Sequence, residues 1–123
     1  MSYDEGLAER IREILQDHRK ISERKMFGGI DFMTRGYMLV GIVDDVLMAR
    51  VGREAYEEAL TLHHVRLMEF TGKPMNGYVF VDPPGLERDA DLTDWIERCH
   101  GFVQSLLPKN PKRSYFFLPD RPR

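Results

Sequence analysis

The first regular pattern along the chain places apolar residues at the three- and four-residue spacing of one side of a helix. The positions on this side are Leu7, Ile11, Ile14, Leu15 and His18. Charged and amide residues fill the intervening positions, and this arrangement predicts an amphipathic helix over about residues 4–18. Two residues are candidates for the N-cap of this helix: Asp4, or Ser2 in a capping box with Glu5.

From Ile21 the pattern alternates between polar and apolar residues with the period of two that is typical of strands. It predicts four strands at residues 21–27, 30–34, 37–43 and 46–51. The turns between them are expected at Gly28-Gly29, Arg35-Gly36 and Asp44-Asp45. Because these connections are very short, the four strands are expected to form an antiparallel meander.

The second half of the chain alternates between helical and extended patterns. We expect a short helix at residues 53–62, a short extended piece at 67–70, a strand at 78–81 after Gly77, and a long helix at 91–107. Between the extended piece and the strand, the segment 71–74 contains Gly72 and Pro74 and is predicted to break the chain direction.

The order α-β-β-β-β-α-β-α predicts an α+β fold with two layers. In this interpretation an antiparallel sheet of about five strands carries the helices mainly on one face, and the other face or one edge is left for a partner. One domain is expected at residues 1–107, followed by a basic tail at 108–123. The apolar run at 115–118 in this tail is either a short docked strand or a partner motif.

Composition narrows the classes of function. The net charge of −2 excludes a general polyanion binder, although the tail alone carries about +4. A single cysteine, Cys99, excludes an intrachain disulfide. The N-terminus does not have the pattern of a signal peptide, and no apolar run reaches membrane-spanning length, so we expect a cytoplasmic protein that does not enter a membrane.

No set of residues predicts catalysis, a cofactor or a metal. Adjacent residues of a strand point to opposite faces, so His63 and His64 are not expected to share an ion. Cys99 lies on the apolar side of the last helix, which predicts a buried and inert thiol. A strand follows Gly28-Gly29 where a phosphate loop would need a helix. The acids near residue 91 are explained by capping of the last helix.

Basic residues give two candidate contact sites. Arg24, Lys25 and Lys73 flank glycine turns and are candidates for contact with an anion or a partner. In the tail, Lys109, Lys112 and Arg113 interleave with aromatic residues, a pattern that also fits single-stranded nucleic acid. For the tail we favour the simpler interpretation of solvated terminal charges. The methionines along the strands are interpreted as core, with a soft binding face as the alternative.

Several segments, in order, resemble the TfoX N-terminal domain family. They are KMFGGIDFM at residues 25–33, GYM at 36–38, LMARVG at 47–52, FTGKPMNGY at 70–78, and the helix around Trp95. The resemblance covers about residues 4–107. It implies an α+β sheet-and-helix layer similar to secretion-chaperone folds and gives structural roles to the motif residues. These are Phe27, Gly28, Gly29, Gly72, Pro74 and Gly77.

The resemblance also implies a biological role. Family members named as bacterial competence regulators act with the cyclic-AMP receptor protein to activate DNA-uptake genes, and they carry a second, helical C-terminal domain. This chain is expected to correspond to the first domain alone. The family has no catalytic residues to transfer. Our leading hypothesis is therefore a non-enzymatic regulatory or protein-interaction domain that binds a protein partner or a second copy of itself. The alternative is a small-anion-binding or enzymatic domain of unassigned activity.

Overall fold

The computed structural model describes residues 3–18, 20–26, 28–70 and 72–106. The predicted tail at 108–123, with Lys109, Lys112 and Arg113, lies outside these ranges, as does Phe27. The helices are α1 (Glu5–Leu15), α2 (Arg53–Leu60) and α3 (Asp89–Leu106), with a short 3-10 helix η1 (Pro83–Leu86) before α3. The strands are β1 (Ile21–Met26), β2 (Gly29–Thr34), β3 (Tyr37–Val43), β4 (Val46–Arg50), β5 (Val65–Phe70) and β6 (Lys73–Val81).

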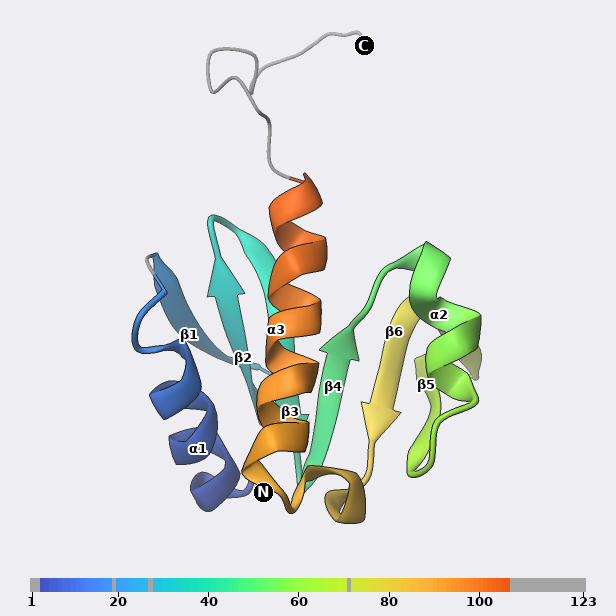
Figure 1. The fold of residues 1–123 in the computed structure, drawn as a ribbon, viewed down its shortest axis with the longest axis horizontal. Coiled ribbons are helices and arrows are strands. Elements are labelled where there is room, and N and C mark those ends of the chain that lie inside the picture. The colour runs from blue at the N-terminus through green and yellow to red at the C-terminus, as the bar shows by residue number, and fades with distance from the viewer. Residues whose placement is uncertain (1–2, 19, 27, 71, 107–123) are drawn as a thin grey trace, which may run out of the picture.

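All strands of the described residues form one antiparallel sheet in the order β1-β2-β3-β4-β6-β5. Figure 1 shows the three helices on the same side of this sheet. Helix α3 crosses β3 and β4, α2 packs on β6 and β5, and α1 packs beside α3. The predicted α+β fold with helices on one face is therefore confirmed.

The number of strands corrects the prediction, because the sheet has six strands rather than about five. The extended piece expected at 67–70 is part of a complete strand, β5, which forms a hairpin with β6. Gly72, with φ +79°, lies between the two strands. Pro74 does not end the hairpin: it is the second residue of β6 and lies opposite Glu69. A proline is tolerated near the start of a strand, where the ladder is not yet continuous.

Local chemistry explains the other boundaries. Of the two N-caps considered for α1, Asp4 fills this role, since its Oδ1 accepts hydrogen bonds from the backbone N–H of Gly6 and Leu7 at 2.9 and 3.2 Å. Arg35 and Gly36 both have positive φ, 53° and 88°, as a two-residue hairpin turn of type I′ requires. Helix α1 ends at Leu15, three residues earlier than predicted.

The core lies between the helices and the sheet. Nine apolar sheet residues of the core have at most 1% of their surface exposed. They are Ile30, Phe32, Leu39, Val40, Ile42, Leu47, Ala49, Val79 and Val81. From α3 the buried residues are Leu92, Trp95, Ile96, Cys99 and Val103. This single core holds all the helices on one face. In the described residues, none of the helices is long and apolar enough to cross a membrane.

Candidate partner-binding face

The face of the sheet opposite the helices carries one cross-strand row that runs through every strand. Strand register aligns Arg24, Asp31, Gly41, Met48, Phe80 and Arg66 in this order from β1 to β5. Met48 and Phe80 are half-buried, and the two arginines at the ends of the row are exposed. We call this side of the sheet, defined by these six residues, the open face, because α1, α2 and α3 all lie on the other side (Figure 1).

Asp31 is the unusual residue of the open face. It is an acidic residue on β2, the second strand from one edge of the sheet, yet only 8% of its surface is exposed. Gly41 makes room for it: a Cβ at Gly41 would lie 2.5 Å from both Oδ1 of Asp31 and Cε of Met48. Burial raises the pKa of the Asp31 carboxyl, and the positive charge of Arg24 partly opposes this effect. Carboxyl groups with a shifted pKa occur often at functional sites.

Asp31→Asn is expected to stabilise the domain by about 1 kcal/mol at pH 7, because a buried negative charge is removed. A carboxyl whose pKa is raised by folding lowers stability only where it is ionised. The difference between variant and parent should therefore shrink as the pH falls through the folded-state pKa and disappear below the ordinary value of 3.8. Urea unfolding from pH 3 to pH 8 measures this difference. Asp45→Asn, at an exposed turn position, is the control. Equal stability of Asp31→Asn and parent at every pH would contradict the conclusion that burial of the ionised Asp31 carboxylate destabilises the domain.

Arg66 closes the row at the β5 edge. Its guanidinium lies 5.0 Å from the centre of the Phe80 ring and donates to Asp82 through Nε and Nη2 over 2.8–3.0 Å. These hydrogen bonds lower the pKa of Asp82. Since Asp82 follows β6 directly, the pair ties the end of β6 to the edge strand. The ring and the guanidinium together present a flat surface at this edge.

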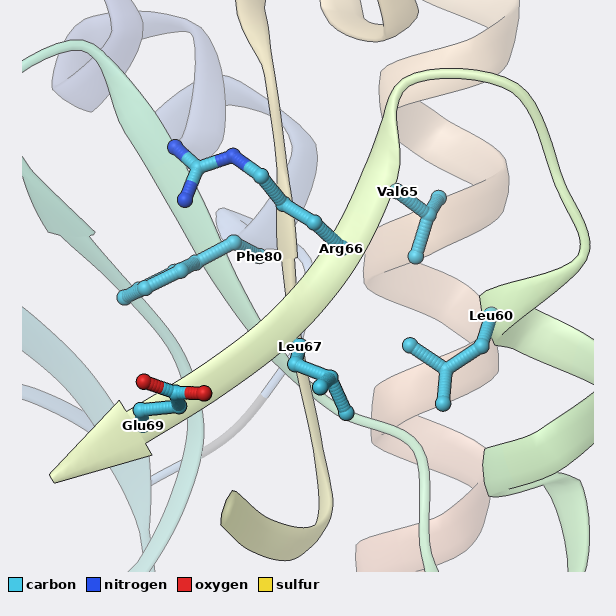
Figure 2. Close-up of a pocket in the computed structure, with 6 residues that line it drawn as sticks. All are labelled: Leu60, Val65, Arg66, Leu67, Glu69 and Phe80. Atoms are coloured by element: carbon cyan, nitrogen blue, oxygen red, sulfur yellow. The ribbon is translucent and has the colours of Figure 1, made fainter. Parts of the chain in front are cut away.

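A shallow groove of about 800 Å³ follows the outer edge of β5. Its lining residues are Leu60, Val65, Arg66, Leu67, Glu69 and Phe80. Figure 2 shows Leu60, Val65 and Leu67 on one side of β5, and Arg66, Glu69 and Phe80 on the other. Leu67 has 42% of its surface exposed, which is high for a leucine in a strand. The groove therefore combines an apolar side, a charged side and an edge strand that, among the residues the structure describes, pairs only with β6.

The residues predicted to contact an anion or partner do not form one pocket. Arg24 and Lys25 lie on β1 and Lys73 begins β6, with three strands between them in the sheet. Arg24 belongs to the open face, whereas the neighbouring Lys25 points to the helix side, where its Nζ lies 5.9 Å from the centre of the Tyr3 ring. Lys73 is exposed at the start of the β5–β6 hairpin.

The structure also places Cys99 and the methionines, for which predictions were made from the sequence. Cys99 is buried, which confirms that part of the prediction, and burial raises the pKa of its thiol to about 12, which disfavours the reactive thiolate. The methionines are divided: Met68 is buried, whereas Met33, Met38 and Met48 are half-exposed. Met33 and Met38 are cross-strand partners next to the row of residues that defines the open face. The alternative interpretation of the methionines as a soft binding face therefore fits Met33, Met38 and Met48, and the core interpretation fits Met68.

Sequence reasoning missed Leu67 and Asp31. Leu67 was placed in the short extended piece at 67–70, but its exposure at the edge of a sheet was not predicted, because the position of β5 in the sheet depends on pairing with β6. No local pattern marks Asp31 as buried, because its burial depends on Gly41 from the next strand.

The fold and this face define a small α+β domain in which one sheet face is packed by helices and the other is not. The family model of the TfoX N-terminal domain matches residues 13–103, and the chain belongs to this family. No curated protein and no solved structure matches the chain.

Proposed function

We propose that this domain is a non-enzymatic regulatory module that binds a protein partner along the edge of β5 and the adjoining part of the open face. The observation that carries the proposal is the β5 edge itself: an exposed leucine, a groove and unpaired strand backbone occur together. An extended segment of a partner can add to such an edge by backbone hydrogen bonds, with alternate side chains entering the groove.

The opposite edge of the sheet, β1, is less suited than β5 to pair with a strand of a partner. Strand β1 presents Glu23, Arg24 and Lys25, and charged side chains on an edge strand discourage pairing with another chain. Glu23 is also held by Arg12 of α1 through two hydrogen bonds of 2.7 and 2.9 Å. The β5 edge has no comparable run of charges, since Leu67 separates Arg66 from the next charged residue, Glu69.

Family membership supports the regulatory part of the proposal. Members of the TfoX N-terminal domain family include competence regulators, and we extend a role in transcription control to this domain. In this proposal the partner is a protein, and the domain performs no reaction of its own. A second copy is one version of that partner: antiparallel pairing of two β5 strands would bring Arg66 of one copy near Glu69 of the other, so that opposite charges meet.

Leu67→Lys is expected to weaken partner binding at least about tenfold, because a charge would be buried in the paired edge. Leu62→Lys is the matched control, since Leu62 is equally exposed, at 40%, but lies outside the strand and the groove. Both variants should unfold within about 0.5 kcal/mol of the parent, as surface changes do. Cross-linking with mass spectrometry in the native cell should give cross-links to the partner along β5 for the parent and for Leu62→Lys. These cross-links should be lost for Leu67→Lys.

Two further measurements complete the test. Light scattering across a concentration series separates a homodimer from a different partner, since only self-association changes the mass of the pure chain. Transcript profiles after gene deletion and after restoration with Leu67→Lys test the regulatory role. A deletion that leaves transcripts unchanged, together with cross-links that are the same for both variants, would refute the proposal.

A further inference from the structure

A cluster of metal-ligating side chains lies on the helix side of the molecule, away from the β5 edge. His18 lies in the turn after α1, while Glu97 and His100 lie one turn apart on the same side of α3. One ligand atom from each residue can be chosen such that all lie within 4.8 Å of one another. Nε2 of His18 is 3.2 Å from Oε2 of Glu97, and the two imidazole rings are 4.1 Å apart.

The donor set has a definite chemistry. Two imidazoles and one carboxylate form a set that binds Zn²⁺ in proteins and leaves a fourth position for water or another ligand. A tetrahedral ion with ligand atoms about 2.1 Å away holds those atoms about 3.4 Å from one another, so each pair has at most about 1.4 Å to close. Rotation of partly exposed side chains can supply this, since 24% of the His18 side chain and 50% of the Glu97 side chain are exposed.

We propose that His18, Glu97 and His100 form a binding site for a divalent first-row transition metal ion of the Zn²⁺ type. The ion joins the end of α1 to the middle of α3, two segments that pack together without any covalent link. This role is independent of the β5 edge and concerns a different surface of the domain.

A neighbouring amide supports the placement of His100. The side-chain nitrogen of Gln104, one turn further along α3, lies 3.3 Å from Nε2 of His100. An imidazole that binds a metal ion through one nitrogen carries its proton on the other and donates it to a nearby acceptor. For Nδ1 of His100 to bind the ion, Nε2 must carry that proton, and a flip of the Gln104 side-chain amide presents its Oε1 as the acceptor.

The competing explanation is a simple ion pair between protonated His18 and Glu97. The two explanations differ in the role of His100, because an ion pair needs only His18 and Glu97, whereas a metal site also needs the second imidazole. His100→Ala therefore separates them. The substitution keeps both residues of the 3.2 Å contact between His18 and Glu97 and removes one ligand.

The test uses the full chain without a purification tag that contains histidine. Titration with Zn²⁺ by calorimetry gives affinity, and titration with Co²⁺ by visible absorption reports ligand number and geometry. We expect one bound ion per chain, and a loss of affinity of at least about tenfold in each of His18→Ala, Glu97→Gln and His100→Ala. The double variant His63→Ala/His64→Ala is the control and should bind like the parent, because its residues lie in the loop before β5.

Circular dichroism of each variant without metal shows whether it is folded, and Glu97→Gln, which keeps the size of the side chain, covers the case in which an alanine variant fails to fold. The melting temperature of the parent should rise with Zn²⁺, because an ion bound only to the folded chain stabilises it. Binding to His100→Ala that equals binding to the parent would overturn the proposal. So would a folded parent chain that binds neither ion more tightly than His18→Ala does.

Discussion

Gly29→Ala is expected to destabilise the domain by about 3 kcal/mol, whereas Gly28→Ala, at the adjacent residue, is expected to cost about 1 kcal/mol. The two glycines belong to the same family segment and were interpreted together as a turn, but the structure gives them different roles. A Cβ added at Gly29 would overlap the backbone carbonyl oxygen of Ile42 on β3. That oxygen belongs to a paired strand, so it cannot move without separating β2 from β3.

Gly28 has the opposite situation. Its φ of +78° disfavours a side chain, but a Cβ there would meet nothing within 4 Å. The expected loss is therefore only the cost of placing alanine in the left-handed region. Gly28→Asn should recover part of it, since asparagine tolerates this region better than alanine.

Urea unfolding followed by circular dichroism measures all three variants against the parent, and the slopes test whether the denatured state is changed. Equal losses at Gly28 and Gly29 would show that the pair acts only as a turn and that the close approach of β2 and β3 contributes nothing. A larger loss at Gly28 than at Gly29 would reverse the roles assigned here.

The part of the fold that was predictable from sequence depends on local interactions. The meander of β1 to β4 follows from alternation and two-residue turns, and both signals lie within a few residues of each other in the chain. Arg35 and Gly36 illustrate this, because their positive φ values are what the turn itself requires. The apolar side of α3 was equally visible, since Leu92, Trp95 and Ile96 are neighbours on one helix.

The part that was missed depends on contacts between distant segments. Pro74 indicates a break when the sequence is considered alone, yet pairing with β5 on one side and β4 on the other continues the strand. Within β6, the carbonyl of Gly77 accepts hydrogen bonds from the backbone N–H of Val51 and Gly52 at 2.9 and 3.0 Å. These partners are more than 20 residues away, so no local pattern contains the information.

The candidate sites follow the same division. His18 and His100 lie at opposite ends of the domain in sequence, and only the packing of α1 against α3 brings their rings to 4.1 Å. From the sequence, His63 was considered with His64, because adjacency in the chain was the only relation available. The structure instead places His18 beside His100, and the proposed metal site depends on this contact between distant segments.

The two faces of the sheet should respond very differently to the loss of a phenylalanine. Phe32 faces the helices and is 1% exposed, so Phe32→Ala is expected to destabilise the domain by about 3–5 kcal/mol through lost burial and a cavity. Phe80 lies on the open face, is half-buried, and contacts Arg66. Phe80→Ala is expected to cost about 1 kcal/mol, because less apolar surface is removed from a site that solvent already reaches.

Partner binding should show the reverse order. Phe80 lines the β5 groove, so Phe80→Ala is expected to weaken the proposed partner contact about tenfold or more while the domain stays folded. Phe32 has no atom in that groove, and Phe32→Ala should bind the partner like the parent under conditions where both are folded. Denaturant unfolding and binding to the cross-linked partner measure the two effects on the same samples. If Phe80→Ala destabilised the domain as much as Phe32→Ala, the open face would behave as a second core, and its proposed role in binding a partner would be wrong.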